Sequence, residues 1–583
     1  MLKSICLCLS LLATTFLTAC GGSSAPDEGL TYLSTAPHSF LDPQRMSWLH
    51  DLRLAKNMYE PLVTYDFTTF TIKPAVAESW SVSDDDMTYT FKIRSDAKWS
   101  NGELVTSHDF AYAWMRALLP DQVASYVELF YPIKGAKAFY DWRTDKLSQF
   151  VKDNPSGNQE AADKLWQETL DHFKQNVGIA TPDDRTVIVT LGKPTPYFLE
   201  LAAFITYSPV NKLSVEAVST INANTAAYTT NSTYWSDAKK ILNNGPYFLK
   251  ERKFKQYIHL AANPHYWNRA NMKNTALIER IVGDPQTAFR IYEDPREKID
   301  MWLDVPTSGS LAGHLINEKR PDAHVMTAAG TYFYNYNCQP KLPSGEDNPL
   351  ADARVRRAFS MAIDRQYIVD RVTQLHEPIA KTYIPPGVIK GYKSPIEAGV
   401  TFNPEQAKKL LAEAGYPNGE NFPSLTLLYN TGSFHEGTAQ AVIKMWENNL
   451  GINVKLQGLE VKVFGDKLRR RDFDIARAAW YGDYPDPTTF LNKMSDTSNN
   501  NDAGWINKEY NDLLDQAANT SDQTERMRLF NKAETILLEE QPMALIYQPI
   551  QLRLYDADRV KGLSQQDNPW NDWQLQFVEE VKK

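Results

Sequence analysis

FDIARAAWYGDYPDPTTFL, residues 473–491, is the stretch that decides the fold. Residues 473–480 alternate as a strand, which places Ile475, Arg477 and Ala479 on one face. The turn residues of 481–487 then end this strand abruptly. An arginine inside the strand and Asp483 just past its end are costly to bury in a core. They are suited to facing a charged small molecule across a crevice.

The residues before this stretch alternate strands with helices. Strand patterns occupy 424–429 and 452–456, and helical patterns occupy 435–450 and 464–470. Together with residues 473–480 this order predicts a doubly wound unit of parallel strands. Ligands in such sheets lie beyond the carboxyl ends of the strands. Asn430 and Asp483, each on a loop that leaves a strand, are therefore expected at one ligand-binding edge.

The rest of the chain is also a mixture of strands and helices. We expect strands at 87–93 and 186–191 and amphipathic helices at 107–119 and 352–372. Residues 136–177 are charged and helix-prone, which is typical of a surface elaboration. The fold class is therefore α/β.

Length and charge narrow the possible functions. A chain of 583 residues with 43% hydrophobic content can form more than one core. Its formal net charge is −9 and it contains no long basic run, so we expect no nucleic-acid partner. The arginines at 469–471 are interpreted as a solvated helix end.

The amino terminus reads as an export signal. Lys3 precedes an apolar run at 5–17, too short for a stable membrane span. Leu17-Thr18-Ala19-Cys20 resembles a bacterial lipobox, which implies a signal peptide at 1–19 and lipidation (palmitate among the acyl chains) of Cys20. Residues 20–28 then form a flexible tether to the membrane. A plain signal peptide with a chance cysteine is the alternative.

Cysteine usage predicts a core without disulfides. Cys6 and Cys8 leave with the signal peptide, and Cys20 carries the lipid. Cys338 is then alone, and we interpret it as a small packed residue.

Several short motifs resemble one known family when they are taken in order. They are Ala77-Glu78-Ser79-Trp80, residues 98–102 (KWSNG), Asp109-Phe110, residues 244–247 (NGPY), 354–358 (RVRRA), 362–365 (AIDR), 411–416 (LAEAGY) and the opening stretch. The family is the dipeptide/oligopeptide-binding solute receptors (family 5) of ATP-driven (ABC) peptide importers. The resemblance covers nearly the whole mature chain.

The resemblance implies a two-lobed periplasmic-binding-protein fold of type II, in the three-domain peptide-binding class. Domain I is expected to be discontinuous, formed by residues 29–59, 186–329 and 550–583. Domain II is expected at 60–185 as an inserted extra domain, and domain III at 330–549 as the second lobe with the doubly wound unit. Two hinge crossings would join the lobes, which close over the ligand as rigid bodies.

The same resemblance implies roles for residues near the opening stretch. Asp483 would hold the α-amine of a peptide, while Asp486 followed by Pro487 suits a helix cap. Arg477 would take the carboxylate of short peptides, with a structural ion pair as its alternative. His435 would serve the carboxylates of longer peptides, or would only be solvated at a helix start.

Other residues fall at cleft positions of the family. They are Asn430, Asn244, Gly245, Tyr126, Ser47, Leu49, Trp480 and Tyr481, with a core role as the alternative for Trp480. The sequence also departs from the family pattern. Ser47 replaces a glutamate, Val461 replaces a tryptophan, and a cysteine pair of a close relative falls on Gly330 and Tyr481. These changes leave the preferred peptide length and side chains open.

The resemblance implies a binding protein in the periplasm or cell envelope that delivers oligopeptides with a free amino terminus to an ABC permease. A receptor for murein (cell-wall) peptides, haem or nickel complexes is the alternative. No nucleophile elbow, HExxH helix or Cys-His metal spacing occurs, so we expect no enzyme activity, no cofactor and no metal. We expect a monomer.

Overall fold

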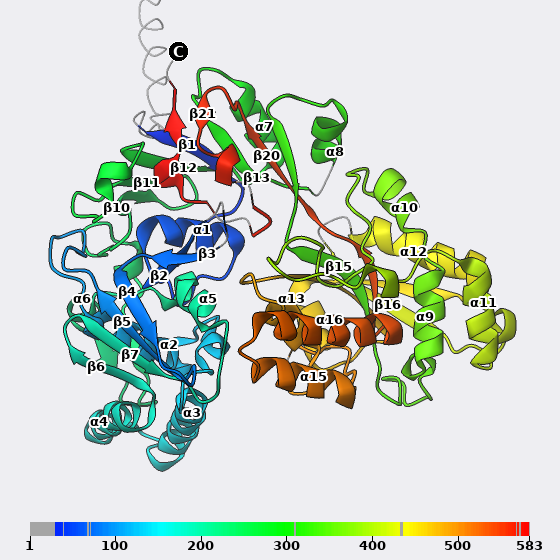
Figure 1. The fold of residues 1–583 in the computed structure, drawn as a ribbon, viewed down its shortest axis with the longest axis horizontal. Coiled ribbons are helices and arrows are strands. Elements are labelled where there is room, and N and C mark those ends of the chain that lie inside the picture. Colours follow the sequence, from blue (N-terminus) through cyan, green and yellow to red (C-terminus); the bar gives the residue numbers. More distant parts are fainter. Residues whose placement is uncertain are drawn as a thin grey trace, which may run out of the picture.

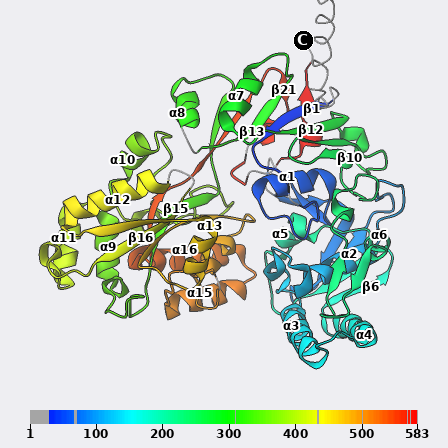
Figure 2. The same cartoon turned by 180° about the vertical axis from the view of Figure 1, so that it is seen from behind.

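The computed structural model describes residues 29–38, 40–66, 69, 71–307, 310–431, 435–498, 500–566, 568–570 and 573–581. The predicted signal peptide and the whole tether, including Cys20, lie outside these residues. Two lobes stand side by side and strands connect them along one edge (Figure 1). Figure 2 shows the same division from behind. Lobe 1 holds a seven-stranded and a four-stranded sheet, and lobe 2 holds a five-stranded sheet.

The seven-stranded sheet of lobe 1 gathers strands from distant parts of the chain. Its order is β10-β11-β12-β1-β13-β20-β14. The bounds are β1 (Leu30–Ser34), β10 (Tyr247–Lys253), β11 (Tyr257–Ala262), β12 (Ala276–Ile281), β13 (Met301–Val305), β14 (Ala323–Thr327) and β20 (Ile550–Tyr555). β1 is parallel to β12 and β13 and is buried along its whole length, as a central strand covered on both faces should be.

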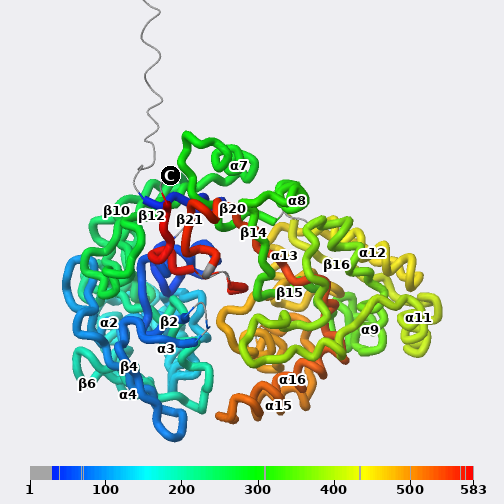
Figure 3. The backbone as a smooth tube through the Cα atoms, turned by 45° about the horizontal axis from the view of Figure 1, so that its top comes forward, coloured from blue at the N-terminus to red at the C-terminus, as the bar shows by residue number. Residues whose placement is uncertain are grey.

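The carboxyl-terminal segment returns to lobe 1. In Figure 3 it appears in red beside β12. The Asn274 side-chain amide donates to the carbonyl oxygens of Leu575 and Val578, at 2.8 Å each. This segment therefore closes one side of lobe 1.

The four-stranded sheet β4-β5-β7-β6 forms the far end of lobe 1. Its strands are β4 (Ala77–Val82), β5 (Thr88–Ile93), β6 (Ile179–Asp183) and β7 (Thr186–Thr190). β5 and β7 confirm the two strands expected at 87–93 and 186–191. β7 hydrogen-bonds to β5 and β6, so it belongs to this sheet rather than to domain I, where the expected boundary at residue 186 had placed it.

Helices cover both sheets of lobe 1. α1 (Leu49–Met58) lies beside the interlobe edge, and α2 (Ser107–Ala117) begins with a capping box between Thr106 and Asp109. α3 (Ala136–Asp153) and α4 (Gln159–Asn176) confirm the helix-prone elaboration and lie at the far end of the lobe. Smaller elements are β2 (Val63–Asp66), β3 (Thr71–Pro74), α5 (Phe198–Ala203), α6 (Lys212–Glu216), β8 (Ser219–Ile221), β9 (Tyr228–Thr230), α7 (Pro285–Glu293), α8 (Ser310–Asn317), β21 (Val560–Lys561) and β22 (Glu579–Glu580).

The five-stranded sheet of lobe 2 has the order β17-β16-β18-β15-β19. Its strands are β15 (Gly330–Tyr336), β16 (Leu425–Asn430), β17 (Val454–Leu459), β18 (Ile475–Tyr481) and β19 (Met543–Tyr547). β16 is parallel to β17 and to β18, which confirms the expected doubly wound unit. β15 and β19 add an antiparallel pair that the sequence did not predict as neighbours.

Both faces of this sheet are covered by helices. Along β15, Tyr332, Tyr334 and Tyr336 belong to one core cluster and Phe333 to another, as the alternation of a strand requires. The helices are α9 (Ala353–Met361), α10 (Arg365–Tyr367), α11 (Pro404–Glu413), α12 (His435–Leu450), α13 (Val461–Arg469), α14 (Thr488–Leu491), α15 (Lys508–Ala518) and α16 (Gln523–Glu540).

The single helix expected at 352–372 is wrong in its length. α9 ends at Met361, because Asp364 adopts an extended conformation and its side chain accepts the backbone N–H of Tyr367. A new helical segment begins there, as an N-cap aspartate favours.

Two short connections join the lobes. The chain passes from β14 to β15 through Ala328 and Ala329, and from β19 to β20 through Gln548 and Pro549. The Ala328 N–H donates to the Pro549 carbonyl oxygen at 2.8 Å, so the two connections are bonded to each other. In the described part of the chain, no helix has both the length and the apolar character needed to cross a membrane.

Candidate functional site

A cavity of 390 Å³ lies where the two lobes meet. Lobe 1 contributes α1 with the loop before it, together with Tyr126, and lobe 2 contributes the loop after β18. The lining residues are Ser47, Trp48, Leu49, Leu52, Arg53, Lys56, Tyr65, Tyr126, Ala203, Phe204, Tyr481, Gly482, Asp483, Pro485, Asn568 and Trp570. Five residues expected from sequence therefore meet in one cavity, namely Ser47, Leu49, Tyr126, Tyr481 and Asp483.

Asp483 is held at the cavity by the end of β18. The Gly482 N–H donates to the Ala329 carbonyl oxygen at 2.8 Å, and the Asp483 N–H donates to the Thr489 hydroxyl at 2.9 Å. These bonds fix the backbone just where the strand stops. The side chain is thereby directed toward lobe 1, where the Tyr126 hydroxyl donates to Asp483 Oδ1 at 3.2 Å.

The Asp483 carboxylate lacks a positively charged partner among the described residues. Burial raises the pKa of Asp483, the Tyr126 hydrogen bond partly offsets this and the charge of Glu128 adds to it, so that the pKa is about 7. An ammonium group of a ligand would relieve this cost, because a charge-assisted hydrogen bond is strong in a site with little water.

Two cationic side chains, Lys56 and Arg53, line the same cavity, and Arg53 is already paired. Arg53 is buried and makes a bidentate ion pair with Asp304, with both N–O distances at 2.6 Å. Its guanidinium also lies over the Trp573 ring. Arg53 therefore supports the cavity floor from α1, and its charge is neutralised within the protein.

Tyr481 forms an exposed part of the wall. It pairs directly with Gly330 across β15 and β18, and 44% of its surface is exposed. A Cβ atom on Gly330 would lie 2.6 Å from Tyr481 Cδ1. Since real contacts do not come so close, the ring occupies space that only glycine leaves open. The two positions named for a cysteine pair in the family are thus cross-strand neighbours here.

A second cavity of 200 Å³ shares Tyr126 and Asp483 with the first. Trp480 lines it and donates its indole N–H to the Thr489 carbonyl oxygen at 2.6 Å. The Trp480 ring also packs against the lobe 2 core, so this residue combines the two roles that were left open. Glu128 and Lys493 line the same cavity, and Lys493 is paired with Asp502 at 3.0 Å.

Asp486 lies behind this wall and performs a structural role. Its carboxylate accepts the backbone N–H of Thr488, at the start of α14, at 3.0 Å. It also makes a buried bidentate ion pair with Arg526, at 2.6 and 2.8 Å. The N-cap of α14 is Pro487, which makes no side-chain capping bond, so Asp486 bonds to the start of the helix from one residue before the expected cap position. The ion pair with Arg526 is an addition.

The structure brings Asn430, Arg477 and His435 together, but none of the three lines either cavity. Arg477 donates to Asn430 Oδ1 at 3.3 Å and lies over the Tyr332 ring. His435 Nδ1 is 3.1 Å from the Tyr332 hydroxyl. Burial and, to a lesser extent, the charge of Arg477 lower the pKa of His435 to about 3. His435 is therefore neutral at physiological pH, and the carboxylate-binding roles of both residues stay predictions.

Asn244 and Gly245 also lie outside both cavities. The Asn244 side-chain amide bonds to the backbone N–H and C=O of Glu60. The Gly245 N–H donates to the Met58 carbonyl oxygen, and a Cβ atom on Gly245 would lie 2.7 Å from the Met58 carbonyl carbon. In this structure the pair holds the segment after α1 against the start of β10. Val461, the other departure from the family, is exposed at the start of α13 and lines neither cavity.

Sequence reasoning missed several apolar lining residues: Trp48, Leu52, Tyr65, Phe204 and Trp570. Trp48 lies between the expected site residues Ser47 and Leu49, and this position was a usable signal. Trp570 had no such signal, because it reaches the cavity from the carboxyl-terminal segment.

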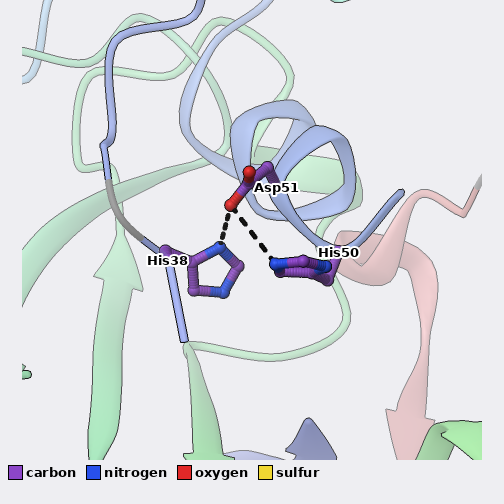
Figure 4. A group of neighbouring side chains, drawn as sticks. All are labelled: His38, His50 and Asp51. Carbon is purple, nitrogen blue, oxygen red and sulfur yellow. Dashed lines mark hydrogen bonds and ion pairs between the residues drawn. The ribbon is translucent and has the colours of Figure 1, made fainter. Parts of the chain in front are cut away.

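His38, His50 and Asp51 form the one group among the described residues with side-chain atoms close enough to share a metal ion (Figure 4). His38 uses both ring nitrogens, at 2.7 Å from Asp51 and 2.9 Å from Glu279. Burial lowers the pKa of His38, but the charges of Glu279 and Asp51 outweigh it and raise the pKa to about 9. A protonated imidazole has no lone pair for a metal, so the group acts as a buried ion-pair cluster that fixes the loop after β1.

Two lobes, two short connections between them and a cavity where they meet are the features of a solute-binding protein. The chain belongs to the bacterial extracellular solute-binding proteins of family 5, whose middle-region model matches residues 71–502. Proteins of this family are transport binding proteins, so the chain is not an enzyme.

Several proteins similar to this chain are peptide-binding proteins. The oligopeptide-binding protein OppA of Bacillus subtilis is 34% identical over 480 residues, which cover 81% of this chain and 78% of that protein. The solved structure of the Escherichia coli murein tripeptide binding protein MppA matches with a TM-score of 0.72 at 29% identity, covering 96% of this chain and 100% of that chain. Haemophilus influenzae OppA in complex with the peptide RPPGFSPFR matches with a TM-score of 0.70 at 26% identity, covering 96% and 100%.

Proposed function

We propose that the protein binds oligopeptides with a free amino terminus between its lobes and delivers them, as a monomer, to an ABC-type peptide permease. The observation that carries this proposal is Asp483, an incompletely paired carboxylate in the wall of the interlobe cavity. A peptide ammonium supplies the missing positive charge. The peptide main chain would add strand-like hydrogen bonds. The peptide-binding relatives support the same ligand class.

Calorimetry with trialanine and its N-acetyl derivative tests this function. The free-amine peptide should bind, and acetylation should weaken binding by about 30-fold or more, because it removes one charge-assisted interaction of roughly 2 kcal/mol. Equal affinities for the two peptides would refute the role of the amine. Mass spectrometry of ligands that co-purify with the protein would identify their length and sequence directly.

Murein peptides are the second candidate ligand, because a murein tripeptide binding protein is among the similar structures. Competition between an ordinary peptide and the same peptide with a D-residue separates the two possibilities. A murein receptor should prefer the D-containing peptide by at least tenfold. The described residues that line the two cavities include no histidine or cysteine, which favours peptides over haem or nickel complexes.

Anchoring through a lipid on Cys20 is part of the same proposal, and Cys20 lies outside the described residues. Labelling of growing cells with a palmitate analogue should mark the protein. The Cys20→Ala variant should remain unlabelled, and labelling of that variant would contradict the anchor.

A further inference from the structure

The interlobe cavity carries exposed aromatic and aliphatic side chains in addition to the groups that would hold a peptide main chain. Trp48 is 71% exposed, Leu49 is 46% exposed and Tyr481 is 44% exposed, and all three line the 390 Å³ cavity. Large apolar side chains grouped in a concave site indicate a binding surface rather than a packing defect. Trp48 and Leu49 come from lobe 1, whereas Tyr481 comes from lobe 2.

The position of Tyr481 is built into the sheet. Its cross-strand partner Gly330 has no side chain, and the Tyr481 ring occupies the space that a Cβ atom would take. Gly330 is buried and Tyr481 is exposed, so the ring is supported from behind and open toward the cavity. An aromatic side chain with few rotatable bonds, held in this way, gives contact area at low entropic cost.

The charges around the cavity determine which part of a ligand lies next to the aromatic side chains. Arg53 is neutralised by Asp304, and Asp483 is the carboxylate without a cationic partner. A ligand whose amine is held by Asp483 would present its nearest side chains to Trp48 and Tyr481. Closure of the lobes then brings these two rings toward each other across that side chain.

We propose that Trp48 and Tyr481 form an aromatic clamp that selects peptides with a bulky apolar side chain, such as leucine or phenylalanine, near the amino terminus. This inference rests on the proposed peptide-binding function and specifies its ligands. Burial of such a side chain is worth roughly tenfold to a hundredfold in affinity. The clamp therefore sets a preference without changing how the amine is held.

The test is calorimetry with tripeptides in which residue one or residue two is alanine, leucine, phenylalanine or lysine, and the others are alanine. Leucine or phenylalanine should improve binding over alanine by at least about tenfold at one of the two positions. Trp48→Ala should remove most of this gain, and Trp48→Phe should keep it. Ile506→Ala is the matched control, because Ile506 is equally exposed at 71% but lines neither cavity.

The outcomes separate the clamp from the proposed function. If trialanine binds through its free amine but neither position prefers leucine or phenylalanine, the clamp is refuted and the peptide-binding function stands. A stronger gain from lysine than from phenylalanine would also refute the clamp. Failure of every free-amine peptide to bind would refute the function itself. Because Trp48 is largely exposed, the unfolding temperature of its variants should equal that of the wild type, and a scan verifies this.

Discussion

Replacement of Asp483 by asparagine tests the site most directly. The only side-chain bond to this carboxylate among the described residues is the 3.2 Å hydrogen bond from Tyr126, which asparagine can also accept. Removing one charge of a buried, hydrogen-bonded charge pair costs roughly 2–5 kcal/mol, and asparagine falls at the low end because it can still accept a hydrogen bond. The substitution should therefore cost about 2 kcal/mol, or about 30-fold in Kd, at pH 7.5.

The same substitution should change the pH dependence of binding. Because burial raises the pKa of Asp483 to about 7, the empty site takes up a proton as the pH falls through 7, and an arriving ammonium must displace it. Wild-type affinity then falls by up to about tenfold per pH unit below 7, while asparagine does not titrate. The peptide amine has a pKa of about 8 and stays protonated over this range. The two affinities should meet near pH 5.5, to within about half a unit.

Calorimetric titrations of trialanine and N-acetyl-trialanine at pH 7.5, 6.5 and 5.5 measure these effects. If Asp483 holds the amine, the losses of binding free energy caused by acetylating the peptide and by substituting Asp483 should not add, because each change removes the same interaction. Asp145→Asn, on the exposed surface of α3, is the control for net charge. A Kd within twofold of wild type at pH 7.5 would show that Asp483 does not hold the amine, and a constant ratio of the two Kd values down to pH 5.5 would refute the raised pKa of Asp483.

Three further changes test the framework around the site. Gly330→Cys combined with Tyr481→Cys should form a disulfide on oxidation, since the two residues are direct cross-strand partners, and a thiol count that does not fall would contradict this register. His38→Gln should lower the free energy of unfolding by about 3 kcal/mol at pH 6. The stabilisation by His38 is complete below the unfolded pKa of 6.5 and is lost as the pH rises through about 9. In urea titrations, the variant's loss of unfolding free energy should therefore be larger at pH 6 than at pH 9.5. An equal loss at both pH values would refute the ion-pair cluster. Arg526→Met should destabilise lobe 2 by about 3–5 kcal/mol, because it leaves Asp486 buried and unpaired. Adding Asp486→Asn should recover part of that loss in denaturant unfolding, and no recovery would argue against the pair.

The parallel unit of lobe 2 could be predicted because its signals are local. Strand and helix patterns from residue 424 to 480 occur in order, and the right-handed crossover rule then fixes the position of Asp483 at the end of β18. The antiparallel strands β15 and β19 join the same sheet from about 90 residues before β16 and about 60 residues after β18. No periodicity within those segments identifies their partners. The break after α9 was also missed, because the apolar spacing continues through Ala362 while the backbone does not.

Some site residues could be predicted and others could not, because some depend on contacts between distant parts of the chain. Asp483 and Tyr481 follow from the end of one strand, and both line the cavity. Arg477 and His435 are residue types suited to a carboxylate, but their neighbours Asn430 and Tyr332 engage them away from the cavity. The contact between Tyr126 and Asp483 spans 357 residues of sequence, and only the folded chain brings such groups together.

The two connections between the lobes have a mechanical consequence. Each is two residues long, and the hydrogen bond from Ala328 to Pro549 prevents one from sliding past the other. Rotation about a single axis is then the low-cost relative movement of the lobes. Both cavities share Tyr126 and Asp483, so one angle governs their width together. A molecule that contacts both cavities would therefore lose both sets of contacts in the same rotation.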